Sequence, residues 1–141
     1  MNFVLDASVA LLWLVPESNP AGVDYAIATL KALKESQAVV PSLLALEVAN
    51  VIAKIESKGV VTEADSQRFI ALFGRLNLVT DQATAAHALG DTLNLARRYK
   101  LSSYDAAYLE LALRTGLPLA TLDADLVKAA TTAGVPIFGT H

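Results

Sequence analysis

The sequence predicts an α/β protein, a three-layer sandwich built on a short, mostly parallel central sheet. Short apolar segments without polar alternation, such as residues 2–5, alternate along the chain with longer segments of helical periodicity. This alternation is typical of a parallel sheet that helices cover on both faces. A chain of 141 residues can bury a substantial core, so we expect residues 1–141 to form a single domain.

Proline, glycine and capping residues set the bounds of the predicted elements. Ser42 and Ser102 are each expected to cap a following helix, and Thr62 with Asp65 has the spacing of a capping box. The predicted strands are residues 2–5, 39–40, 78–80 and 118–121, with a fifth short strand at 136–138. The predicted helices are residues 8–15, 20–34, 43–58, 63–75, 81–99, 103–115 and 123–133. The buried face expected for the helix at 81–99 consists of Ala86, Leu89, Leu93 and Ala96.

Composition excludes several classes of protein. The longest apolar run, residues 7–15, is far shorter than the ~20 residues of a membrane-spanning helix, so we expect a cytoplasmic protein with no membrane segment. The chain has no cysteine, and neither His87 nor His141 has the spacing of a zinc pair. A net charge of -3 argues against a general nucleic-acid coat, but it is compatible with an enzyme that holds RNA locally.

Several acidic residues sit where strands are expected to end and helices to begin. Taken singly, Asp6, Asp105 and Asp123 are each explained as a helix cap or capping-box residue, and Asp125 as a partner of a helix dipole. Glu47 is different, because the predicted helix places it beyond the capping positions. Considered alone, each of the four aspartates is therefore explained by a structural role at a helix start.

Together the acids indicate a metal site. The carboxyl ends of parallel strands form one edge of the sheet, where ligands bind, and Asp6 and Asp123 are expected at two such ends. Asp105 opens the helix that leads into the Asp123 strand, and Glu47 is expected two turns into the helix that follows another strand. Converging carboxylates repel one another unless a cation lies between them, and an all-oxygen donor set suits Mg²⁺ or Mn²⁺. Such a site favours hydrolysis of a phosphodiester bond.

Four stretches carry a resemblance to a known family. DASVALLWLVPE at residues 6–17, LLALEVANVI at 43–52, LARRYKLSSYDAAYLELALRTGLPLATLDADL at 95–126 and the later GVPI occur in this order. In combination they resemble a PIN-domain ribonuclease, and within that family the VapC-type toxins of toxin–antitoxin pairs. The resemblance covers nearly the whole chain.

The resemblance implies both a site and partners. It implies Mg²⁺ or Mn²⁺, an RNA substrate, a homodimer and inhibition by a cognate antitoxin protein. Ser8 matches the small polar residue after the first aspartate, and Thr121 the hydroxyl before the last one. Asn50 is a candidate for orienting a carboxylate or a metal-bound water, or else faces solvent, and Asp125 is a fifth ligand or a peripheral dipole partner. The implied catalytic and metal-binding residues are Asp6, Glu47, Asp105 and Asp123.

Two alternatives accompany this interpretation. The chain would instead be a catalytically weak binding or regulatory module if it engaged an antitoxin but cleaved no RNA. The basic cluster of Arg97, Arg98 and Lys100 is expected to be a solvated helix face, with contact to RNA phosphate or to the antitoxin as the functional alternative. Tyr108 is expected in the core, and Tyr104 is left open between an RNA-stacking and an interface role.

Overall fold

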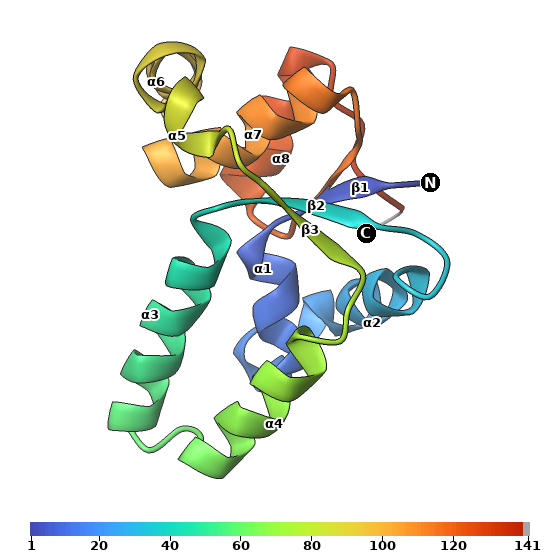
Figure 1. The fold of residues 1–141 in the computed structure, drawn as a ribbon, viewed down its shortest axis with the longest axis vertical. Helices are drawn as coiled ribbons and strands as arrows, with labels where there is room; N and C mark the ends of the chain where they lie inside the picture. The colour runs from blue at the N-terminus through green and yellow to red at the C-terminus, as the bar shows by residue number, and fades with distance from the viewer. Residues whose placement is uncertain (140–141) are drawn as a thin grey trace.

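A four-stranded parallel sheet forms the centre of the molecule in a computed structural model, which describes residues 1–139 (Figure 1). His141 lies outside these residues. The strand order is β3-β2-β1-β4, and every strand pair is parallel, so the predicted fold class is confirmed. The expected fifth strand at 136–138 is reduced to one bridge between Leu119 and Ile137. The strands are β1 (Phe3–Leu5), β2 (Ala38–Pro41), β3 (Leu78–Asp81) and β4 (Leu119–Ala120).

Helices lie on both faces of this sheet and give the three layers. Figure 1 shows α5 to α8 on one side of the strands and α1, α2 and α4 on the other, with α3 and α4 extending away as a hairpin. The α-helices are α1 (Ala7–Ala10), α2 (Val23–Ala32), α3 (Leu44–Ser57), α4 (Glu63–Phe73), α5 (Thr84–His87), α6 (Leu93–Tyr99), α7 (Ser103–Thr115) and α8 (Ala124–Ala133). The other helical turns are η1 (Leu11–Trp13), η2 (Pro16–Ser18), η3 (Pro20–Gly22) and η4 (Ala88–Thr92).

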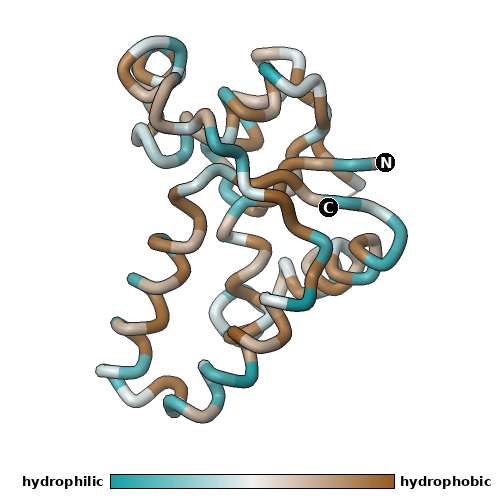
Figure 2. The backbone as a smooth tube through the Cα atoms, in the orientation of Figure 1, coloured by the Kyte–Doolittle hydropathy of each residue, from teal (hydrophilic) through white to brown (hydrophobic). Residues whose placement is uncertain are grey.

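The core lies where β1 is enclosed on both faces. Each residue of β1 is fully buried, which explains its unbroken apolar sequence, and α7 packs directly on β1 and β2. Figure 2 shows the hydrophobic colour concentrated on the central strands. Burial of α7 extends through seven consecutive residues from Ala106 to Ala112, so this helix is held firmly against the sheet. The beginning of α7 is thereby fixed at the carboxyl edge of the strands.

Several predicted capping interactions are present. Thr62 and Asp65 form the reciprocal hydrogen bonds of a capping box at the start of α4. Ser102 caps α7 by accepting a hydrogen bond from the Asp105 N–H at 3.1 Å. The prediction for Ser42 was wrong, because Leu43 occupies the N-cap position of α3 and the Ser42 N–H donates to Thr84 Oγ1. Glu47 consequently lies in the first turn of α3, nearer to the helix start than its predicted position.

The helix predicted at 81–99 is the main difference from expectation. The chain there forms α5, the π-helical segment η4 and then α6. A π turn contains an extra residue, which rotates all later side chains about the helix axis and breaks the assumed periodicity. Ala86 and Leu89, predicted to be buried, are exposed, Leu89 to 88%, while Leu93 and Ala96 are half-buried.

The first predicted helix is also divided. Residues 8–15 form the end of α1 followed by the 3₁₀ turn η1, and Pro16 then excludes any further α-helical extension. The Trp13 indole N–H donates to the Ala26 carbonyl at 2.8 Å, which ties η1 to α2. Among the described residues, no helix combines the length and apolar character needed to cross a membrane.

Candidate active site

Asp6 follows β1 directly and lies buried at the carboxyl edge of the sheet. Ser8 Oγ donates to Asp6 Oδ2 at 2.6 Å, and Thr121 Oγ1 donates to the same oxygen at 2.7 Å. The Leu122 N–H in turn donates to Ser8 Oγ at 3.0 Å. Ser8 and Thr121 therefore fix the orientation of Asp6 and tie the end of β1 to the end of β4, because Thr121 directly follows β4.

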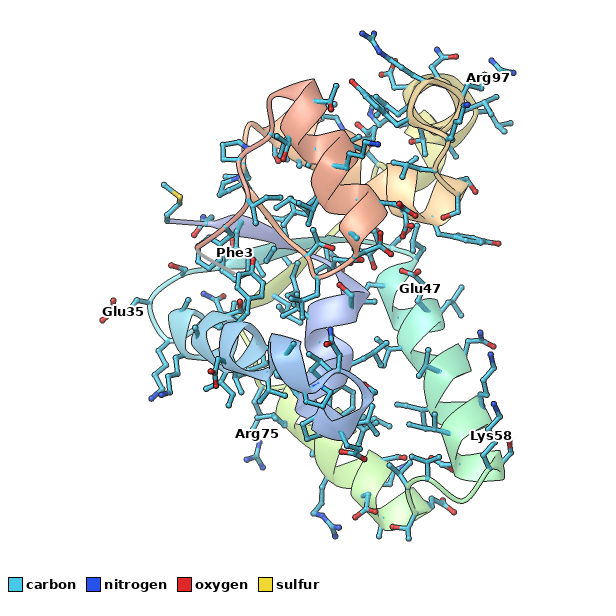
Figure 3. The ribbon with its side chains drawn as sticks, turned by 180° about the vertical axis from the view of Figure 1, so that it is seen from behind. Phe3, Glu35, Glu47, Lys58, Arg75 and Arg97 are labelled. Carbon is cyan, nitrogen blue, oxygen red and sulfur yellow. The ribbon has the colours of Figure 1, made fainter. Side chains whose placement is uncertain are left out.

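Glu47 reaches this edge from the first turn of α3. Figure 3 shows it beside side-chain oxygen atoms that gather between α1, α7 and α8. The Tyr108 hydroxyl, from the fully buried face of α7, donates to Glu47 Oε1 at 2.6 Å. Burial raises the pKa of the Tyr108 phenol well above its usual range, so the hydroxyl keeps its proton and remains a donor. Tyr108 therefore does more than fill the core.

The sequence contained an indication that the Tyr108 hydroxyl would take part in the site. A buried tyrosine hydroxyl needs a hydrogen-bond partner, and Tyr108 lies three residues after Asp105 on one helix face. The sequence contained no comparable sign that the partner would be Glu47, because that contact joins two helices distant along the chain.

Asp105 and Asp123 approach from the beginnings of α7 and α8. Asp123 is the N-cap of α8, and its Oδ1 accepts a hydrogen bond from the Leu126 N–H at 2.9 Å. The predicted capping role of Asp123 is thus real and coexists with its place at the sheet edge. Ser102 caps α7 through the backbone of Asp105, and the Asp105 carboxylate lies near enough to Asp6, Asp123 and Asp125 to feel their charges.

The electrostatics show that the four acids form one group. Burial raises the pKa of Asp6 against the opposing hydrogen bonds of Ser8 and Thr121, and the charge of Asp123 raises it further. Burial also raises the pKa of Glu47, as do the charges of Asp6 and Asp105, while the Tyr108 hydrogen bond lowers it. Burial raises the pKa of Asp105 to about 6, with added repulsion from Asp123, Asp6 and Asp125.

A fifth acid at the sheet edge is neutralised by the protein itself. Asp81, at the end of β3, accepts two hydrogen bonds from Arg114, at 3.1 and 2.7 Å. The same guanidinium donates to both oxygens of Glu110, at 2.7 and 3.0 Å. Arg114 lowers the pKa of Asp81, opposite to the shifts at Asp6, Glu47 and Asp105. This network, which the sequence did not reveal, is a structural clamp between α7 and β3.

The comparison with known families agrees with this geometry. The sequence model of the PIN domain matches residues 3–131, which is most of the chain. The chain belongs to the PIN domain family. The resemblance inferred from the sequence motifs is thereby confirmed.

Individual relatives of this PIN domain carry further information. The chain is 29% identical to Ribonuclease VapC3 of Pyrobaculum aerophilum over 128 residues, covering 91% of this chain and 94% of that protein. The crystal structure of PAE2754 from Pyrobaculum aerophilum is similar with a TM-score of 0.64 and 22% identity, over 92% of this chain and 79% of that one. VapBC2 from Rickettsia felis, bound to a DNA fragment from their promoter, gives a TM-score of 0.65 and 15% identity, over 97% of each chain.

The remaining predicted residues of this PIN domain lie at the margin of the acidic group. Asn50 is exposed and lines a hollow of about 420 Å³ together with Glu47, Leu46 and Tyr104. The structure thus places Asn50 beside Glu47 in the solvent-exposed hollow, while Tyr108 supplies the hydrogen bond that holds Glu47. Asp125 is exposed in the first turn of α8 and acts on Asp105 through its charge.

The donor set of this PIN domain fits a hard divalent cation. The four acids offer only oxygen ligands, and three of them have raised pKa values of the kind that a nearby cation would relieve. Within residues 1–139, no three acidic or histidine side chains are already arranged to enclose an ion. Binding a cation would therefore require the carboxylates to turn toward one another.

Proposed function

We propose that this chain is a Mg²⁺- or Mn²⁺-dependent endoribonuclease that hydrolyses RNA phosphodiester bonds and acts as the toxin of a toxin–antitoxin pair. Membership of the PIN domain family and similarity to a protein named Ribonuclease VapC3 support the activity. Similarity to VapBC2 of Rickettsia felis supports an antitoxin partner.

The observation that supports the proposal most strongly is that some acids at the sheet edge have a basic partner and others have none. Asp81 and Glu110 share Arg114, whereas in the part of the chain that the structure describes Asp6, Glu47, Asp105 and Asp123 form no ion pair with a basic side chain. Concentrated negative charge without an internal counter-ion destabilises a fold, and such clusters are typical of functional sites, where a bound cation offsets the repulsion. A divalent cation is the simplest such ligand for four oxygen donors.

The chain's own residues would orient the ligand atoms. Ser8 and Thr121 donate to Oδ2 of Asp6, and Tyr108 donates to Oε1 of Glu47, so these side-chain hydrogen bonds leave the second oxygen of each carboxylate for a ligand. A bound cation would stabilise charge on the phosphate and lower the pKa of an attacking water. The first turns of α3, α7 and α8 meet at this edge, and their dipoles favour anionic groups there. Asp125 adds negative charge from a peripheral position.

We also propose that the protein forms a homodimer and works in the cytoplasm. Exposed apolar side chains support an interface, notably Leu89 at 88%, Leu46 at 75% and Tyr104 at 62%. Light scattering after size-exclusion chromatography measures this directly, and a monomeric mass at micromolar concentration would contradict it.

Cleavage of RNA by the purified protein tests the central proposal. Wild type should release discrete fragments from a cellular RNA pool with Mn²⁺ or Mg²⁺ and none with EDTA. Asp6→Asn should reduce the rate at least about 100-fold, which is the upper end for residues that merely orient a metal ligand. Asp91→Asn is a matched control, because the Asp91 side chain is 76% exposed and lies outside the acidic group. Undiminished cleavage by Asp105→Asn and Asp123→Asn would refute the acidic-site model.

The alternative function has a distinct outcome in the same experiment. If the protein bound an antitoxin and divalent metal, yet left every RNA intact, it would be a catalytically weak regulatory module. Expression of the chain alone in a cell, followed by sequencing of RNA 5′ ends, would then show neither growth arrest nor new ends.

A further inference from the structure

A basic hollow lies next to the acidic group, between the end of α6 and α8. Its volume is about 380 Å³. Three of its lining residues are cationic, and they come from segments far apart in the sequence, two at the end of α6 and one in α8. The residues that line the basic hollow are Arg98, Tyr99, Lys100, Asp125, Lys128, Ala129 and Thr132.

The cations of the basic hollow are available for a ligand. Within residues 1–139 the ion pairs use Arg68, His87 and Arg114, and none uses a cation of the basic hollow. Arg97, the other arginine of this basic cluster, points outward from α6 in Figure 3 and does not line the hollow. The convergence of Lys128 with Arg98 and Lys100 is therefore more specific than a solvated basic face of α6.

Asp125 and the chain segment after Lys100 connect the basic hollow to the acidic group. Asp125 lines the hollow and also acts on Asp105 through its charge. Lys100 opens the short connection that leads to the Ser102 cap and then to Asp105 in the first turn of α7. A chain bound across the acidic group would therefore reach the basic hollow within a short distance.

The backbone at Lys100 supplies an independent observation. Lys100 has φ 56° and ψ 44°, and is the one non-glycine residue with positive φ among the residues described. This left-handed conformation at the end of a helix is normally taken by glycine, as it is at Gly116 and Gly134. A lysine in this conformation raises the energy of the backbone relative to glycine, but it places a positive charge at the hollow.

We propose that the basic hollow binds phosphate groups of the RNA strand on one side of the scissile bond, which rests on the proposed ribonuclease function. A protein with a net charge of -3 and an acidic catalytic edge repels a polyanion, so productive binding requires local cations. Lysine and arginine side chains bind backbone phosphates without reading sequence. The half-buried Tyr99, whose ring lies 5.7 Å from the Arg98 guanidinium carbon, provides one wall of the hollow.

Salt dependence of RNA binding tests the assignment. Affinity for a fluorescein-labelled single-stranded oligoribonucleotide is measured by anisotropy in EDTA across a range of salt concentrations, for wild type and for Lys100→Gly/Lys128→Ala. Each lost phosphate contact should reduce the slope of log K against log [salt] by about 0.7. Lys31→Ala/Lys34→Ala, in the last turn of α2 and just after it, removes the same charge elsewhere and should leave the slope unchanged. Thermal melting of Lys100→Gly alone should be no lower than that of wild type, since glycine relieves the left-handed backbone.

The outcomes separate this inference from the proposed function. If wild type cleaves RNA with Mn²⁺ but both double variants show the wild-type slope, the phosphate assignment is overturned while the ribonuclease stands. If only Lys100→Gly/Lys128→Ala loses affinity for the antitoxin and keeps its RNA slope, the hollow takes an acidic protein segment instead, and the assignment is again overturned. If wild type neither binds nor cleaves RNA, both proposals fall together.

Discussion

Replacing Asp105 by asparagine should stabilise the protein while abolishing its affinity for divalent metal. Burial raises the pKa of the half-buried Asp105 carboxylate from 3.8 to about 6, with a further contribution from repulsion by Asp123, Asp6 and Asp125. At neutral pH the Asp105 carboxylate is therefore ionised in an environment that favours its protonated form, and this lowers the stability of the fold. Asparagine keeps the shape and removes the charge.

The size of the effect follows from the pKa. A rise of about 2 units corresponds to a ceiling of about 3 kcal/mol, at 1.36 kcal/mol per unit. Solvent reaches Asp105, so screening reduces this to about 1.5 kcal/mol. Loss of a carboxylate from the first turn of α7 removes about 0.5 kcal/mol of favourable helix-dipole interaction. The net gain is about 1 kcal/mol, or a rise in Tm of about 4 °C for a chain of this size.

The assay compares urea unfolding of wild type and Asp105→Asn in EDTA at two pH values. A carboxyl with a raised folded-state pKa destabilises the fold fully above that pKa and ceases to do so below its unfolded-state pKa. The advantage of the variant should thus be complete near pH 7.5 and nearly vanish near pH 4. Saturating Mn²⁺ should reverse the order, since an ion at 100 times its Kd adds about 2.7 kcal/mol to wild type. An apo variant less stable than wild type at pH 7.5, or an advantage independent of pH, would refute the reasoning.

Three further predictions concern the clamp, the tyrosine and the pH dependence of metal binding. Arg114→Met should lower the free energy of unfolding by about 2 to 3 kcal/mol in urea denaturation, because it leaves two mostly buried carboxylates unpaired. Arg68→Met, which breaks an exposed pair, should change it by less than about 0.5 kcal/mol. Tyr108→Phe should keep the wild-type circular dichroism spectrum but weaken Mn²⁺ binding about tenfold in calorimetry, since Glu47 loses its orienting hydrogen bond. Mn²⁺ affinity of wild type should increase as pH rises from about 5 to about 7, because Asp105 must release its proton to bind an ion.

Each of these three predictions has an outcome that would contradict it. Equal losses for Arg114→Met and Arg68→Met would show that the buried network contributes no more than an exposed pair. Unchanged Mn²⁺ affinity in Tyr108→Phe would mean that the hydroxyl serves only core packing. A flat pH profile of Mn²⁺ binding, followed by electron paramagnetic resonance of the free ion, would remove Asp105 from the ion's environment.

The sequence predicted the fold well where local signals and burial agreed. The continuous apolar run of β1 and the capping box at Thr62 each specify one structure, because alternatives would expose apolar groups or leave helix N–H groups unpaired. The prediction of one regular helix at residues 81–99 was wrong. The apolar spacing of this segment is compatible with a regular helix, and the π turn at η4 depends on tertiary packing. Leu89, which lies inside η4, was expected in the core and is 88% exposed.

The site was predictable as a group of acids but not as a network. Asp6, Glu47, Asp105 and Asp123 were placed at one sheet edge by parallel topology alone, and the structure brings them within electrostatic range of one another. Their roles in catalysis and metal binding stay predictions. The hydrogen bond from Tyr108 to Glu47 could not be derived in this way, because it depends on how closely two helices approach.

Because Asp6 accepts hydrogen bonds from both Ser8 and Thr121, the site can form only after nearly the whole chain has been synthesised. Ser8 emerges from the ribosome early, but Thr121 and Asp123 emerge only when most of the polypeptide exists, and β4 must then insert beside β1. A nascent or truncated chain that ends before β4 contains Asp6 and Ser8 but lacks Thr121, which completes the hydrogen bonds to Asp6, and Asp123, the acid at the start of α8. We expect such fragments to be harmless to a host cell, and two fragments divided in the α3–α4 turn to regain the site only on reassociation.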